Sequence, residues 1–124
     1  MMLKPTAVLL LLIVALGCDR QTHNPYTIEM TQGRRYKPQR ITITQGERVI
    51  WENSSEALHT VTCDPNASMR WGVALLPAGA DPFHSGDIQP GRSWSYSFWA
   101  PGTYRYFCIY HEDEMIGEVH VRPR

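Results

Sequence analysis

A cysteine, a histidine and a methionine lie within one short stretch near the end of the chain, at Cys108, His111 and Met115. A thiolate, an imidazole and a weak thioether form a soft ligand set that suits copper in both of its oxidation states. A trigonal copper site needs a second imidazole, and His59 can supply it from the end of a distant strand-like segment. We therefore predict that these four residues bind one copper ion that alternates between Cu(I) and Cu(II).

Short alternations of apolar and polar residues mark the segments that must position these side chains. They are found at 26–30, 41–44, 48–53, 58–62, 93–98, 103–108 and 118–121. No long segment has helical periodicity, and 64–87 holds either a loop or a short helix around 67–75. Several short strands in about 100 residues predict an all-β fold, a Greek-key antiparallel β-sandwich. A rigid sandwich can hold distant segments together at one end, as the proposed site requires.

The amino terminus has the features of an export signal. Lys4 precedes an apolar run at 7–16 that is short for a membrane span, and Gly17 and Cys18 follow it. A small residue before a cysteine at this place resembles the lipobox of bacterial lipoproteins, in which the thiol is lipidated; an ordinary secretory signal is the alternative. We expect three parts: a signal peptide at 1–17, a tether at 18–25 and a copper-binding domain at 26–124.

Both kinds of signal export the protein, so we expect an extracytoplasmic, periplasmic location, with a lipid on Cys18 as the membrane anchor. Lys and Arg number 12, as do Asp and Glu. This balance gives no reason to propose a nucleic acid as a partner.

The three cysteines are Cys18, Cys63 and Cys108, and an odd number cannot all pair in disulfides. A disulfide between Cys63 and Cys108 would destroy the proposed copper site, so we expect Cys63 to be a small buried apolar residue. Three further histidines, His23, His84 and His120, are predicted to lie on the surface rather than to bind metal.

The ordered pieces of the chain resemble the plastocyanin/azurin-type cupredoxins, which are small type 1 blue copper proteins. The similar segments within 26–122 include His59-Thr60-Val61, Pro101-Gly102-Thr103-Tyr104, Cys108, His111 and Met115-Ile116-Gly117-Glu118-Val119. The resemblance implies a cupredoxin-like fold. It also implies that His59, Cys108, His111 and Met115 are the copper ligands and that electrons leave through the exposed edge of His111.

Two features of the ligand segment depart from the family pattern. Three residues separate His111 from Met115, a spacing between those of plastocyanin and amicyanin. Tyr110 stands where the family often has proline, so its N–H is available as a donor. We hypothesise that this N–H hydrogen-bonds the Cys108 sulfur and raises the reduction potential.

A site closed by four ligands has no open position for a small-molecule substrate, so we expect an electron carrier and not an enzyme. The expected partners are redox proteins such as c-type cytochromes or membrane oxidoreductases. The acidic run Glu112-Asp113-Glu114 is either a solvated turn or a surface that orients a basic partner. A periplasmic copper-binding or delivery protein is the first alternative, and a metal-free interaction module is the second.

Overall fold

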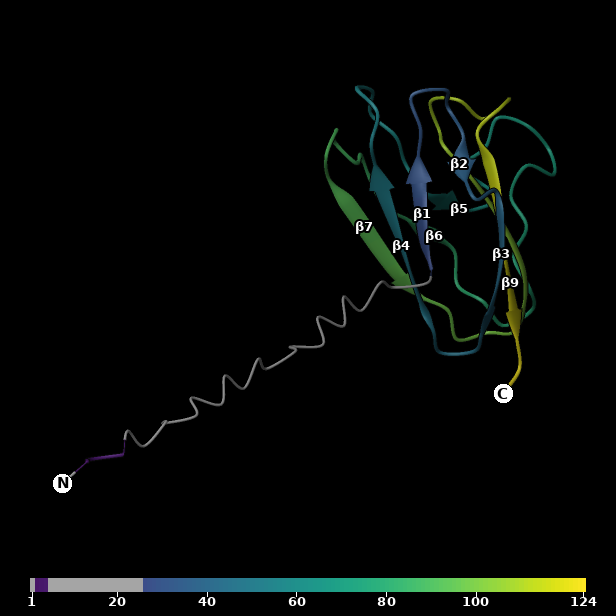
Figure 1. Cartoon of the computed structure of the whole chain (residues 1–124). Helices are drawn as coiled ribbons and strands as arrows, with labels where there is room; N and C mark the ends of the chain where they lie inside the picture. The colour runs from purple at the N-terminus through teal and green to yellow at the C-terminus, as the bar shows by residue number, and fades with distance from the viewer. Residues whose placement is uncertain (1, 5–25) are drawn as a thin grey trace.

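The folded part of the computed structural model, which describes residues 2–4 and 26–124, is a sandwich of two β-sheets (Figure 1). The strands are β1 (Thr27–Met30), β2 (Tyr36–Lys37), β3 (Arg40–Thr44), β4 (Arg48–Asn53), β5 (Thr62–Cys63), β6 (Phe83–His84), β7 (Ser93–Ser97), β8 (Gly102–Phe107) and β9 (Ile116–Arg122). One sheet has the order β2-β1-β4-β7 and the other β3-β9-β8-β5-β6. The described residues form no helix, so none of them forms a helix able to span a membrane.

The predicted all-β sandwich is confirmed, but both sheets are mixed rather than purely antiparallel. β1 runs parallel to β4, and β3 runs parallel to β9. β3 belongs to the second sheet, and when the chain returns to the first sheet β4 runs in the same direction as β1. Alternation in a sequence shows which face of a strand is buried, but it does not show which strand lies beside it.

Aromatic side chains fill the space between the sheets and hold the ends of β8 and β9 in place. Val49 and Trp51 alternate inward on β4 and are fully buried. The Trp51 ring contacts Phe98 and, edge-on, Tyr106, with ring centroids 6.2 and 5.4 Å apart. Tyr106 packs so closely on Gly117 that a Cβ there would lie 2.3 Å from the Tyr106 Cζ. Each large side chain buried in this way stabilises the fold by about 1.5–3 kcal/mol.

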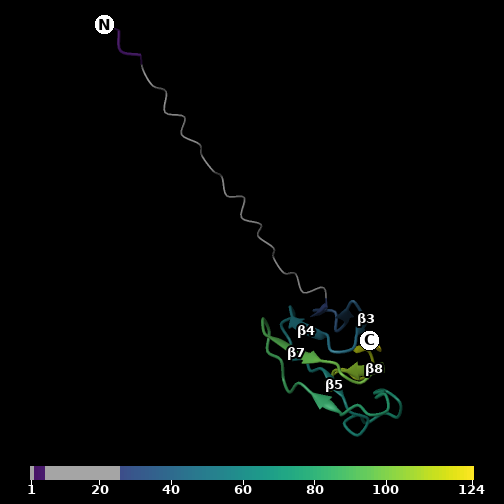
Figure 2. The same ribbon diagram turned by 90° about the horizontal axis from the view of Figure 1, so that it is seen from below.

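The two ends of the sandwich carry different parts of the chain. β9 begins at the upper end in Figure 1, and β1 begins at the lower end, where the carboxyl terminus also lies. The segment between β5 and β6 is a loop and not a helix, and an isolated bridge from Leu75 to Arg105 fastens it to β8. Figure 2 shows this loop extending sideways beyond the sheets, near β5. Cys18 and His23, with most of the predicted signal and tether, lie outside the described residues.

Candidate metal centre

A tight turn between β8 and β9, residues 108–115, presents three of the four predicted ligands; we call it the ligand loop. The His111 N–H donates to the Cys108 carbonyl at 3.0 Å, and the Met115 N–H donates to the His111 carbonyl at 2.9 Å. The Cys108 N–H in turn donates to the Met115 carbonyl at 3.1 Å. These bonds close the loop across its base, so the three side chains are held by backbone that is itself fixed.

His59 reaches the same end of the sandwich from the segment between β4 and β5. Its N–H donates to the Ile88 carbonyl at 3.3 Å, and the Ile88 N–H donates to its carbonyl at 2.8 Å. The buried side chain of Asn53 donates from Nδ2 to the carbonyls of Ala57 and Ile88 at 2.8 and 2.9 Å. The Asn53 amide therefore links the residues just before His59 to the Ile88 segment that pairs with His59.

The structure brings His59, Cys108 and His111 together. The Cys108 Sγ lies 3.7 Å from the His59 Nδ1 and 3.6 Å from the His111 Nδ1. The three candidate ligand atoms all lie within 4.8 Å of one another, an arrangement consistent with one type 1 copper ion. Met115 is fully buried and its backbone bonds to Cys108 and His111. Its role as a fourth ligand stays a prediction.

The Cys108 sulfur receives its backbone hydrogen bond from Thr60 and not from Tyr110. The Thr60 N–H lies across the site, with its nitrogen 3.4 Å from the Cys108 Sγ. The hypothesis about Tyr110 is wrong, because in the described part of the chain its N–H does not bond this sulfur; its hydroxyl instead donates to Asp87 at 2.5 Å. Thr60 reaches the sulfur because it follows His59, whose side chain lies beside Cys108.

Both imidazoles are tuned toward the neutral form that binds metals. Burial lowers the pKa of His59 from its ordinary value of 6.5, and the neighbouring His111 acts in the same direction. Burial also lowers the pKa of His111, and the charge of Arg34 adds to this effect. Among the described residues, the buried His59 Nε2 has no hydrogen-bond partner, although the nearby backbone of Thr31 offsets part of the fall in the pKa of His59. Neutral imidazoles and a thiolate are the states required for metal binding.

Two carboxylates of the ligand loop are bound by the long loop between β5 and β6. The Glu112 carboxylate accepts the Met69 N–H at 3.1 Å, and Asp113 forms an ion pair with Arg70. Each exposed pair contributes little stability on its own. Together, however, they fix the long loop against the ligand loop.

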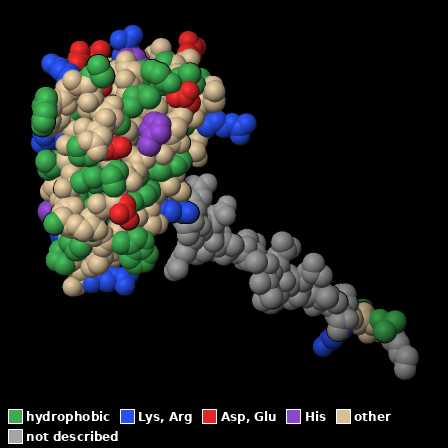
Figure 3. Space-filling model, turned by 180° about the vertical axis from the view of Figure 1, so that it is seen from behind, with side chains coloured by type: hydrophobic (Ala, Val, Ile, Leu, Met, Phe, Trp, Pro, Cys, Tyr) green, Lys and Arg blue, Asp and Glu red, His purple; other side chains and the backbone are tan. Residues whose placement is uncertain are grey.

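The third carboxylate is bound from the other side, by the turn between β1 and β2. The Glu114 Oε1 lies 3.4 Å from the Arg34 Nη1, and the Arg35 Nη1 donates to the Glu114 carbonyl at 3.0 Å. Figure 3 shows acidic and basic side chains side by side at the upper end of the domain. The acidic run is therefore largely neutralised by arginines, which sequence analysis missed because these arginines lie far away along the chain.

Cys63 is a free, buried thiol, as predicted, and so is Cys108. The Cys63 S–H points to the carbonyls of Leu75 and Arg105, both 3.3 Å from the sulfur. Burial raises the pKa of this thiol to about 12. Cys63 therefore stays protonated, as a structural side chain.

Two of the three histidines predicted to be on the surface can be placed, and both are exposed. The His84 Nδ1 lies 2.8 Å from the Thr62 hydroxyl oxygen. The His120 Nδ1 lies 3.0 Å from the Thr103 hydroxyl oxygen. Neither belongs to the cluster of ligand atoms around Cys108.

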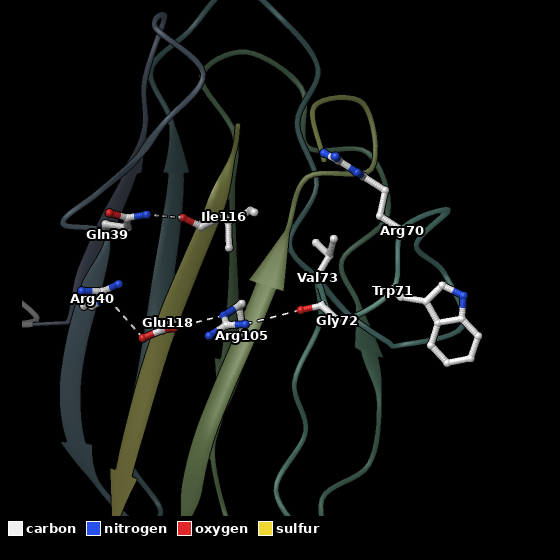
Figure 4. A pocket seen from close by; sticks show the side chains of 9 residues that line it. All are labelled: Gln39, Arg40, Arg70, Trp71, Gly72, Val73, Arg105, Ile116 and Glu118. Carbon is white, nitrogen blue, oxygen red and sulfur yellow. Dashed lines mark hydrogen bonds and ion pairs between the residues drawn. The ribbon is translucent and has the colours of Figure 1, made fainter. Parts of the chain in front are cut away.

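A groove of about 400 Å³ lies on the outer side of the five-stranded sheet, away from the cluster. Figure 4 shows Glu118 between Arg40 and Arg105, and it bonds to both at 3.1 Å. Trp71 stands at the rim with its ring directed away from the sheet. Glu118 thus offsets part of the positive charge of the arginines that line the groove, and we assign the groove no part in the metal centre.

Comparison with known proteins gives a consistent result. The family model described as "Copper binding proteins, plastocyanin/azurin family" matches residues 24–122. The chloroplast plastocyanin of Tetradesmus obliquus is 33% identical over 70% of this chain, but the match spans only 58% of the plastocyanin's length. The plastocyanin of Scenedesmus fuscus is 32% identical over 62% of this chain and 74% of its own.

Solved structures agree on the fold. A mutant of amicyanin in its Cu(I) form superposes with a TM-score of 0.61 at 24% identity, over 77% of this chain and 80% of that chain. The purple cupredoxin of Nitrosopumilus maritimus superposes with a TM-score of 0.60 at 24% identity, over 77% of this chain and 98% of that chain. At this level of identity, the likeness shows a shared cupredoxin fold.

Proposed function

This chain belongs to the plastocyanin/azurin family of copper-binding proteins, and from that premise we propose that it carries single electrons between redox proteins outside the cytoplasm. The observation that supports this most is the position of the Cys108 Sγ, within 3.7 Å of the Nδ1 atoms of His59 and His111. In this proposal these residues and Met115 hold one type 1 copper ion.

Copper bound at this place would supply one-electron chemistry, because it changes between Cu(II) and Cu(I). Rapid exchange of electrons requires ligand positions that change little between the two states. The backbone bonds of the ligand loop, the Asn53 amide and the aromatic core all resist movement of the ligands. The Thr60 N–H stabilises negative charge on the Cys108 sulfur.

The exposure of the ligands favours electron transfer over catalysis. His59, Cys108 and Met115 are fully buried, so a small-molecule substrate has no route to them. His111 is only half-buried, and its exposed edge is the proposed exit for electrons. We propose redox proteins such as c-type cytochromes or membrane oxidoreductases as partners. The ion pairs of the ligand loop leave little free negative charge to select a basic one.

We propose a periplasmic location, with a lipid on Cys18 as the anchor. The folded domain begins at the end opposite to the ligand loop (Figure 1). An anchor there would leave His111 facing away from the membrane and accessible to partners. Mass spectrometry of protein extracted from membranes should find acyl chains on Cys18. Cys18→Ala should move the protein to the soluble periplasmic fraction, and an unlipidated wild-type protein would contradict the anchor.

Copper delivery is the rival function, and it uses the same ligands. A carrier of electrons should show a reversible one-electron couple and should release copper slowly to a chelator in both oxidation states. Rapid transfer of copper to an acceptor, without a reversible couple, would favour delivery. Cyclic voltammetry and competition with a Cu(I) chelator separate the two functions.

A further inference from the structure

A line of three hydrogen bonds runs from the edge strand β6 to the ligand loop. The Ile109 N–H donates to the Thr60 Oγ1 at 3.1 Å, and the hydroxyl oxygens of Thr60 and Thr62 are 2.9 Å apart. The Thr62 Oγ1 is 2.8 Å from the Nδ1 of His84. Both threonines are fully buried, whereas His84 is exposed. An exposed, titratable ring is thereby connected to the backbone of the metal centre.

The direction of these bonds follows from the donor at the inner end. An amide N–H can only donate, so the Thr60 Oγ1 accepts from Ile109. The bond between the Thr60 and Thr62 hydroxyls can run in either direction; we take Thr60 as the donor, because the Thr62 Oγ1 is the one acceptor that its hydroxyl meets among the described residues. The Thr62 hydroxyl then donates to the His84 Nδ1, which accepts only when that nitrogen carries no proton.

We propose that His84 is a positioning residue for the metal centre, and that proton uptake by its ring raises the reduction potential. This inference rests on the proposed electron-transfer function. Thr60 is the link, because its N–H donates to the Cys108 Sγ at 3.4 Å and its carbonyl accepts the Tyr36 hydroxyl at 2.5 Å. A change in the hydrogen bond between the Thr62 and Thr60 hydroxyls can therefore alter the position of the Thr60 N–H that bonds the Cys108 sulfur.

A proton on the His84 Nδ1 has two effects. It removes the acceptor of the Thr62 hydroxyl, and it places a positive charge at the outer end of the chain. Positive charge near the site favours the less highly charged state of the copper, so the potential rises.

The surroundings of His84 leave Thr62 as its polar partner. Within residues 26–124, β6 lies at the edge of its sheet and pairs only with β5. The titratable groups on β5, on the flanks of both strands and on the facing part of the ligand loop are Cys63, Asp64, Asp81, Asp87 and Tyr110. In the part of the chain that the structure describes, none of them forms a hydrogen bond or an ion pair with His84.

The test compares two histidines with the same kind of partner. In His84→Asn the amide oxygen can still accept from Thr62, but the side chain does not titrate. His120→Asn is the matched control, because His120 is also exposed and bonded to a threonine hydroxyl, at 3.0 Å, without a connection to the ligand loop. The potential of the copper-loaded full chain is measured between about pH 8 and 5.

The potential of the wild-type chain and of His120→Asn should rise as the pH falls. His84→Asn should keep the blue colour and lose at least half of that rise. Thr62→Val, which keeps the imidazole but interrupts the chain, should fall between them. An unchanged pH dependence in His84→Asn, or an equal loss in His120→Asn, would overturn the proposal.

The metal-free protein gives a second reading that does not depend on electron transfer. The amide chemical shift of Ile109 should show a titration step that is present in the wild-type chain and in His120→Asn and absent from His84→Asn, in addition to the step from the nearby His111, which all three share. An Ile109 titration that is identical in the wild-type chain and in His84→Asn would overturn the inference. A colourless copper complex with an intact Ile109 titration would instead count against the proposed function alone.

Discussion

The part of the chain that the structure describes contains two fully buried cysteines, Cys63 and Cys108, with opposite chemistry. Around Cys63 the polar neighbours are two backbone carbonyls, which accept a proton from sulfur. Around Cys108 they are a backbone N–H, which donates to sulfur, and two imidazole nitrogens. Both sulfurs are hidden from solvent to the same degree. Burial keeps Cys63 a thiol, and no imidazole of the described cluster lies beside it, whereas Cys108 has two imidazoles next to it that can bind the same metal ion. The neighbours therefore decide which of two equally buried cysteines can serve as a ligand.

Exchange of the two cysteines for alanine should give the largest contrast. Cys108→Ala should abolish the visible absorption of the copper-loaded protein, because the thiolate is the source of the charge-transfer band. Cys63→Ala should keep the full band and lose only about 1 kcal/mol of stability from a small cavity. Absorption spectra and chemical denaturation of both variants provide the measurement. Loss of colour in Cys63→Ala with an intact fold would refute the structural role given to that thiol.

Stability at alkaline pH should also depend on Cys63. Because the pKa of Cys63 is raised from 9.0 to about 12 in the folded chain, the unfolded chain loses this proton first. The stability that Cys63 contributes is thus complete below pH 9.0 and is lost as the pH rises toward 12. The loss is on the order of 1 kcal/mol per pH unit. Urea unfolding should show a shallower alkaline decline for Cys63→Ala; an identical decline would mean that other groups, such as Tyr36, account for it.

At acidic pH, the two histidines beside Cys108 should lower the stability of the metal-free protein. The pKa values of His59 and His111 are lowered in the folded metal-free chain, so the unfolded chain binds protons more readily. Their contribution is present above about pH 6.5 and is lost as the pH falls below it. Thermal unfolding of the metal-free protein should therefore shift to lower temperature between about pH 7 and 5. Copper should raise the melting temperature at neutral pH, where both imidazoles are free to bind it, and a melting temperature that is insensitive to copper would contradict the site.

The smallest effect is expected at Met115. A thioether is a weak ligand, so Met115→Leu should retain the copper and the blue colour and change only the reduction potential. Leucine has a similar volume and fits the same buried position with little loss of stability. Voltammetry and metal analysis of the variant test this. An empty site in Met115→Leu would show that Met115 is required for binding and not merely for tuning.

The sequence predicted much of this architecture because ligand type and strand alternation are local properties. Cys108 and His111 lie on one turn, and the strands that flank it could be recognised from alternation alone. Features that depend on distant neighbours were missed. The Thr60 N–H faces the Cys108 sulfur across 48 positions of sequence, and Glu114 meets Arg34 across 80. The parallel pairing of β1 with β4 was missed for the same reason, since alternation does not identify the neighbouring strand.

Absorption and EPR spectra of the chain loaded with Cu(II) test the central claim most directly. One copper ion per chain should give an intense visible band from the Cys108 thiolate and the narrow copper hyperfine splitting of a type 1 site. Both signals should be absent from Cys108→Ala and present in Cys63→Ala. Stoichiometric copper binding without these signals in the wild-type chain, or no copper binding at all, would contradict the account.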